Sequence, residues 1–152
     1  MRQIVGRIFP FLGLGLLLCS VPAAFAGHAN VNGTWVLKPT KTNFAGEEAM
    51  TTGTITISDR QHHIYISRSF KYDNPTGGFD YSFSTDGAEN STIRKGKTFT
   101  SKAKWEGDTL TVTTTQDGMT TIEHFNWTPD GTMVVMVDRP SHQSQTLFFT
   151  RQ

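Results

Sequence analysis

Arg68 is the side chain whose type and position in this sequence best suit the binding of a charged group. It has the same strand parity as Ile64, Ile66 and Phe70, and residues two apart on a strand point to one face of the sheet. If that face is buried, a guanidinium enters an apolar interior. Arginine there pairs best with a carboxylate, through two parallel hydrogen bonds. We therefore predict that any bound ligand carries an acidic head that meets Arg68.

Three other arrangements of Arg68 stay open. In the first, its guanidinium lies near a mouth of the fold. In the second, Tyr65 and Ser67 are the inward-facing residues instead. The third arrangement pairs Arg68 with an internal carboxylate such as Glu123. A buried charge is costly unless it is paired, and an internal partner would leave no role for a ligand at this position.

Other residue types with chemical potential are dispersed. The histidines His62 and His63 are adjacent, so on a strand they point to opposite faces, and no two of the five histidines have the spacing of ligands on a helix. No serine has the context of a catalytic nucleophile. We predict no metal site, no cofactor and no enzymatic activity. The five histidines are His28, His62, His63, His124 and His142.

The elements that position these residues are predicted to be strands. Glycines recur at intervals of 9 to 13 residues within turn-forming sequences, as in Asp117-Gly118 and Asp130-Gly131. Between them apolar and polar residues alternate, so that Leu110 and Val112 oppose Thr111. This pattern indicates one buried and one solvent-exposed face. We predict an all-β fold, a single antiparallel up-and-down β-barrel of about 8–10 strands. The turn glycines are Gly78, Gly87, Gly96, Gly107, Gly118 and Gly131.

Bulky residues are predicted to face the inside of this barrel. They either line a pocket or fill it, and strand parity cannot decide between the two. A ligand cavity of about 300 Å³ or more would favour the pocket. The candidate ligand-contacting residues are Arg68, Ile64, Ile66, Tyr81, Phe83 and Phe99, and further inward aromatics are Phe79 and Trp105.

The segment from Pro39 to Met50 does not alternate and contains the pair Glu47-Glu48. We expect a long loop with a short helical turn that lies over one mouth of the barrel. The alternative is a plain surface connection, since most loops are only that.

The first 26 residues have the features of a signal peptide. Arg2 and Arg7 precede an apolar run, and Ala24-Phe25-Ala26 is a small-x-small cleavage site. The domain then comprises residues 27–152, in the periplasm or secreted, with no membrane-spanning segment after cleavage. The only cysteine, Cys19, lies in the leader, so disulfides are excluded. A formal net charge of +1 for the whole chain gives no reason to expect nucleic acid as a partner. We expect a monomer.

The residues Gly33, Trp35 and Arg151 resemble the signature of the calycin superfamily, which includes lipocalins, fatty-acid-binding proteins and avidins. The stretch Gly-Thr-Trp-x-Leu-x-x-x-Lys-x-x-Phe, with Lys41 and Phe44, is similar to the opening of small exported bacterial proteins of lipocalin-like type. The resemblance implies that Trp35 closes the barrel floor against Arg151. It also implies that Arg68 is similar to the inward arginines with which fatty-acid-binding proteins hold a carboxylate.

These observations favour an exported, non-catalytic binding protein for a small hydrophobic or amphipathic ligand. The alternative is a structural or protein-interaction module of the cell envelope, with its barrel filled by its own side chains. Cavity volume distinguishes the two.

Overall fold

In the computed structural model of the chain, residues 31–60, 63–74, 78–94 and 96–152 are described, and of 78–81, 83–85 and 94 only the backbone is. They form one antiparallel sheet of ten strands, with one short 3-10 helix, η1 (Pro39–Lys41), after the first strand. The predicted leader lies outside the described residues. The strands are β1 (Gly33–Leu37), β2 (Met50–Arg60), β3 (His63–Tyr72), β4 (Gly78–Thr85), β5 (Asn90–Arg94), β6 (Lys97–Glu106), β7 (Thr109–Gln116), β8 (Met119–Trp127), β9 (Thr132–Asp138) and β10 (Gln145–Arg151).

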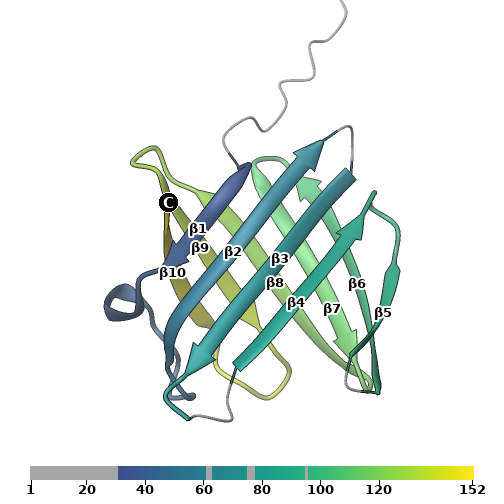
Figure 1. The fold of residues 1–152 in the computed structure, drawn as a ribbon, viewed down its shortest axis with the longest axis horizontal. Coiled ribbons are helices and arrows are strands. Elements are labelled where there is room, and N and C mark those ends of the chain that lie inside the picture. Colours follow the sequence, from purple (N-terminus) through teal and green to yellow (C-terminus); the bar gives the residue numbers. More distant parts are fainter. Residues whose placement is uncertain (1–30, 61–62, 75–77, 95) are drawn as a thin grey trace, which may run out of the picture.

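The sheet curls on itself into a barrel in which consecutive strands pair, except β4 and β5 (Figure 1). Its order is β4-β3-β2-β1-β10-β9-β8-β7-β6-β5, so the first and last strands pair in the middle of the sheet. Trp35 lies opposite Ile55 on one side and Arg151 on the other. Strands β4 and β5 are the edges of the sheet. The predicted all-β, up-and-down architecture is confirmed.

Alternation along the strands decides which residues enter the core. In β3 Ile64 and Ile66 are buried, as are Ile55 and Ile57 in β2, while Tyr65 between Ile64 and Ile66 is exposed. The β7–β8 hairpin shows why the turn sequence matters: Asp117 and Gly118 have φ angles of 50° and 79°. Two positive φ angles match the right-handed twist of the adjoining strands, and Asp-Gly is a pair that accepts them readily.

One end of the barrel is packed solid with aromatic side chains. Trp127 lies edge-on to Trp35, with ring centroids 6.3 Å apart, and contacts Trp105 at 5.6 Å. Trp35 donates a hydrogen bond from Nε1 to the Val31 carbonyl at 2.9 Å. The Arg151 guanidinium lies over the Trp35 ring, 5.1 Å from its centroid. Tryptophan supplies a large apolar surface for such a floor, and a cation over its face adds an electrostatic attraction.

Gly33 makes room for this arrangement. Its φ angle is 139°, and a Cβ atom there would lie 3.5 Å from Nε of Arg151. That backbone conformation favours glycine, so Gly33 allows β1 to begin directly beside the arginine that covers Trp35. Within the described ranges, no helix has the length and apolar character that a membrane span requires.

Candidate functional site

The end of the barrel opposite the tryptophans contains a cavity of about 810 Å³. Sites for small molecules commonly occupy about 300–1,000 Å³, so the space is large enough for one. Among the described residues, side chains pack the floor and leave this space open. The apolar part of the cavity wall comes from Met50, Ile55, Phe70, Phe99, Met119, Val137, Pro140 and Leu147.

Arg68 faces the interior and is 7% exposed. Its Nη1 atom lies 2.7 Å from each carboxylate oxygen of Glu123, and its guanidinium lies 5.6 Å from the centroid of the Phe125 ring. The ion pair is the internal partner that the sequence had left open. It also explains how a charge is accommodated here, because a buried guanidinium needs a hydrogen-bonded counter-ion.

The Arg68–Glu123 pair crosses the interior of the barrel. Arg68 belongs to β3 and Glu123 to β8, which are five places apart in the sheet order and face each other across the barrel (Figure 1). Both residues border the cavity. The pair therefore forms the polar bottom of the cavity, between the open space and the packed floor.

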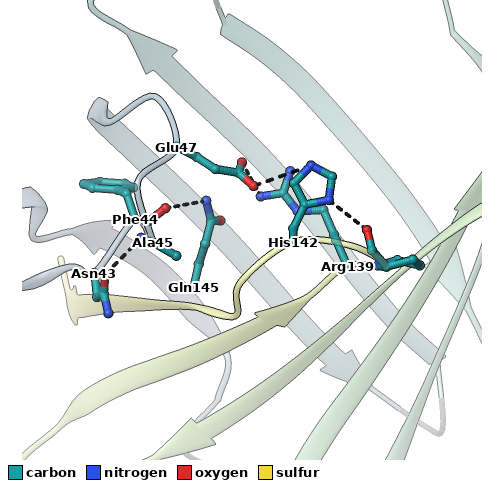
Figure 2. Close-up of polar contacts among 8 residues, drawn as sticks. Asn43, Phe44, Ala45, Glu47, Arg139, His142 and Gln145 are labelled. Carbon is teal, nitrogen blue, oxygen red and sulfur yellow. Dashed lines mark hydrogen bonds and ion pairs between the residues drawn. The ribbon is translucent and has the colours of Figure 1, made fainter.

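The loop between η1 and β2 contributes to the mouth of the cavity. Glu47 accepts a hydrogen bond from Nη2 of Arg139 at 2.6 Å, and Nε2 of His142 lies 3.9 Å from the other oxygen of Glu47 (Figure 2). Both partners follow β9, so the contact ties the loop to the β9–β10 connection. The loop therefore lies at a mouth, as predicted, and the 3-10 helix η1 is the short helical turn expected in it.

Two further contacts hold the same loop against β10. Asn43 and Thr146 exchange two backbone hydrogen bonds, at 2.9 and 3.0 Å. Gln145, which is 4% exposed, donates from Nε2 to the Phe44 carbonyl at 3.1 Å (Figure 2). These bonds satisfy backbone groups that a loop would otherwise present to solvent, and they make the loop a fixed part of the cavity rim.

Comparison with known proteins supports this architecture. No protein-family model matches the sequence, and no curated protein does. Among solved structures, the "REP1-NXSQ fatty acid transporter" is similar, with 19% identity and a TM-score of 0.60 over 82% of this chain and 97% of that chain. A Schistosoma mansoni fatty acid binding protein in complex with arachidonic acid has 14% identity and a TM-score of 0.60, over 82% and 98%. The SAHS protein of Ramazzottius varieornatus has 8% identity and a TM-score of 0.60, over 81% and 96%.

The chain has the antiparallel up-and-down β-barrel fold of these proteins. At these identities the likeness concerns the fold alone. Within this fold, Gly33, Trp35 and Arg151 lie together at the closed end, as the resemblance implied.

The structure distributes the predicted ligand-contacting residues between the cavity and the core. Arg68 and Phe99 line the cavity. Ile64 and Ile66 face inward but are packed in the core and do not line it, because they lie nearer the floor end of β3. Parity along a strand predicts the face of the sheet but not the depth along the barrel axis, so the sequence placed Ile64 and Ile66 among the candidate ligand-contacting residues. The side chains of Tyr81 and Phe83 lie outside the described part of the chain, although their backbone pairs with Arg68 and Ile66.

Sequence reasoning missed the polar residues of the mouth. Glu47 had been noticed only as half of an acidic pair in a loop, and nothing in the sequence connected it to a basic residue 92 positions away. The remaining residues begin or end a strand or lie in a loop beside one, where alternation no longer predicts a direction. The residues missed are Glu48, Tyr72, Gln116, Arg139, His142 and Gln145. In the described ranges, no three metal-ligating side chains gather.

Tyr72 at the mouth is expected to titrate above the ordinary tyrosine value of 10.0. Burial raises its pKa, the positive charge of Arg139 lowers it, and Glu48 and Glu47 raise it. Arg139→Gln should therefore raise the Tyr72 pKa further, whereas Glu48→Gln should lower it. The measurement is an ultraviolet titration of tyrosinate, with Tyr72→Phe to identify the signal. A lower Tyr72 pKa in Arg139→Gln, or a higher one in Glu48→Gln, would contradict this electrostatic account.

The same shift has a consequence for stability. Because the folded chain holds the Tyr72 proton more tightly than the unfolded chain, the stabilising contribution is fully present below pH 10.0. It is lost as the pH rises through the folded-state pKa. Tyr72→Phe should therefore flatten the fall in unfolding free energy above pH 10.0.

Gly53 is a further position on which the shape of the cavity depends. A Cβ atom there would lie 2.5 Å from Cδ1 of Phe70 and 3.2 Å from Cβ of Leu37. The near atom is at the base of the ring, so the clash cannot be relieved by a small movement of its far end. Gly53→Ala should lower the unfolding free energy by about 1–3 kcal/mol, as overpacking commonly does. Urea denaturation measures this loss.

Combining Gly53→Ala with Phe70→Leu tests whether the Phe70 ring causes this loss of stability. If the Phe70 ring is what the new methyl group meets, Gly53→Ala should cost clearly less in a Phe70→Leu background than in the wild type. Equal costs in the two backgrounds would show that the ring is not responsible.

Proposed function

We propose that this protein binds a small hydrophobic or amphipathic molecule in the cavity above the Arg68–Glu123 pair and acts as its non-catalytic carrier or sensor. The observation that supports the proposal most directly is the cavity itself, about 810 Å³ in volume, with apolar side chains such as Met50, Phe70 and Leu147 in its wall. Apolar walls with a few placed polar groups are typical of sites for small molecules. Proteins of similar fold include fatty acid transporters and fatty-acid-binding proteins, which is consistent with an apolar ligand.

We further propose that the protein works outside the cytoplasm. The basic start, apolar run and small-x-small site of residues 1–26 support export with cleavage after Ala26. Mass spectrometry of the protein recovered from its own host should give a chain that begins at Gly27. An intact leader in the membrane fraction would refute export, while leaving the cavity and its ligand unaffected.

The decisive experiment on binding is native mass spectrometry of the protein purified from its host, which should retain a small molecule. A matched pair of variants assigns it to the cavity. Thr114 lines the cavity, whereas Thr113 is its neighbour on β7 and belongs to the other face. Thr114→Phe should narrow the space and reduce the retained mass, and Thr113→Phe should keep it. Loss in both variants, or a fluorescent lipid probe that binds neither variant nor the wild type, would overturn the proposal.

A further inference from the structure

We infer that the cavity prefers a neutral amphipathic ligand, with a hydrocarbon body and a hydroxyl or amide head, over a free carboxylate. This inference rests on the proposed function and specifies its ligand class. It follows from the way in which Glu123 occupies the guanidinium that an acidic head would otherwise seek.

The charges around the cavity balance. Among the described residues that line it, basic and acidic side chains are equal in number when His142 is neutral, so no net positive field attracts an anion. The deep pair is neutral in itself, and at the mouth Arg139 already contacts Glu47 at 2.6 Å. The six charged residues are Arg68, Lys97 and Arg139 against Glu47, Glu48 and Glu123.

A ligand carboxylate would meet two obstacles at the bottom of the cavity. Nη1 of Arg68 already contacts both oxygens of Glu123 at 2.7 Å, so a ligand carboxylate could reach that nitrogen only by displacing a charge-assisted hydrogen bond. It would also place a second carboxylate beside Glu123, which is 8% exposed. Like charges at a poorly solvated site repel strongly, so one of the two would have to bind a proton.

A hydroxyl or amide head meets neither obstacle. An ionised carboxylate has about four lone-pair sites, and the two contacts to Arg68 leave Glu123 able to accept from a ligand O–H or N–H. Thr121 lies two residues before Glu123 on β8, and Thr114 faces it on β7; both line the cavity. These hydroxyls can donate to the oxygen of the same head.

The wall above these groups suits a hydrocarbon chain. Met50, Phe70 and Leu147 are each less than a tenth exposed and border the cavity. Burial of apolar surface against them supplies affinity without regard to the head. The tail therefore provides binding energy, and the Glu123 region decides which head is accepted.

The test compares three ligands with one tail: hexadecanol, palmitamide and palmitate, each below its aggregation limit and at neutral pH. Their affinities for the wild-type protein are measured by displacement of a fluorescent lipid probe. The alcohol and the amide should bind at least about tenfold more tightly than palmitate, because one charge-assisted interaction is worth that much or more. Palmitate binding as tightly as the neutral ligands, or more tightly, would overturn the inference while leaving the proposed function intact. If no ligand displaces the probe, the proposed function itself fails.

Glu123→Gln tests whether the negative charge of Glu123 causes the preference for neutral heads. It keeps the size of the side chain and an acceptor for Arg68 but removes the negative charge, so palmitate should gain about tenfold or more in affinity relative to hexadecanol. Glu106→Gln is the matched control, since it removes the same charge from an exposed pair with Lys104 outside the cavity lining and should leave the preference nearly unchanged. A folded Glu123→Gln protein with the wild-type preference would refute the role of Glu123. If that variant does not fold, the wild-type comparison alone decides.

Discussion

Replacing Glu123 by leucine should lower the free energy of unfolding by about 3 kcal/mol. Removing one partner of a buried ion pair typically costs about 3–5 kcal/mol, because the other charge is left without compensation. The Glu123 side chain is 10% exposed and that of Arg68 is 7% exposed. The lower end of the range is expected because the pair borders a cavity, in which solvation offsets part of the penalty. Urea denaturation at neutral pH measures the loss.

The double variant separates the charge from the packing. Arg68→Leu added to Glu123→Leu removes both charges of the pair. The protein should recover most of the lost stability, since well-packed apolar residues often replace a buried pair without cost. Asp117→Asn is a control on an exposed pair, because the Asp117 and Lys97 side chains are about half exposed, and it should change stability far less. A Glu123→Leu effect no larger than that of the control would show that the pair is effectively solvated.

The inward direction of Arg68 was predictable from the sequence, whereas its partner was not. Strand alternation depends only on neighbouring residues, so the shared parity of Arg68 with Ile66 and Phe70 indicated an inward guanidinium. Glu123 is 55 positions away in the chain and lies on the opposite wall. That contact depends on how the barrel closes, which parity alone does not give, and Glu123 therefore stayed one alternative among several.

The depth of a residue along the barrel axis could not be predicted from the sequence either. Ile64 and Arg68 have the same parity, yet Ile64 lies in the packed core and Arg68 borders the cavity. The distinction arises because three tryptophans gather at one end only, and their contacts join strands β1, β6 and β8. Of these, only Trp35 belonged to a recognisable motif, so the division of the barrel into a filled half and a hollow half had no local sequence pattern.

Thr111 shows where alternation is an incomplete guide. It opposes the inward Leu110 and Val112, yet it is only 6% exposed. Its hydroxyl donates to Glu106 at 2.7 Å and lies 3.2 Å from Nδ1 of His124. Long polar side chains thus cover a threonine on the outer face. Alternation predicts the direction of a side chain, and the neighbouring strands decide how much water reaches it.

The second large effect is expected at the closed end. Trp35→Ala should lower the free energy of unfolding by about 3–5 kcal/mol, the usual cost of truncating a buried tryptophan. Trp35 is 2% exposed, contacts Trp127 edge-on and donates a hydrogen bond to Val31. The substitution removes all of these contacts and leaves a hole in the floor. Chemical denaturation of the purified variant measures the loss.

Arg151→Ala is the matched variant for the cation above the ring. It removes the guanidinium that lies 5.1 Å from the Trp35 centroid and the hydrogen bond to the Asn32 carbonyl at 2.8 Å, but leaves the floor packed. Its cost should be smaller, about 1–2 kcal/mol. In the Trp35→Ala background Arg151→Ala should cost less still, because the two residues act on each other. Strictly additive losses would show that Arg151 stabilises the barrel independently of Trp35, and a loss below about 1 kcal/mol for Trp35→Ala would contradict the role of the floor.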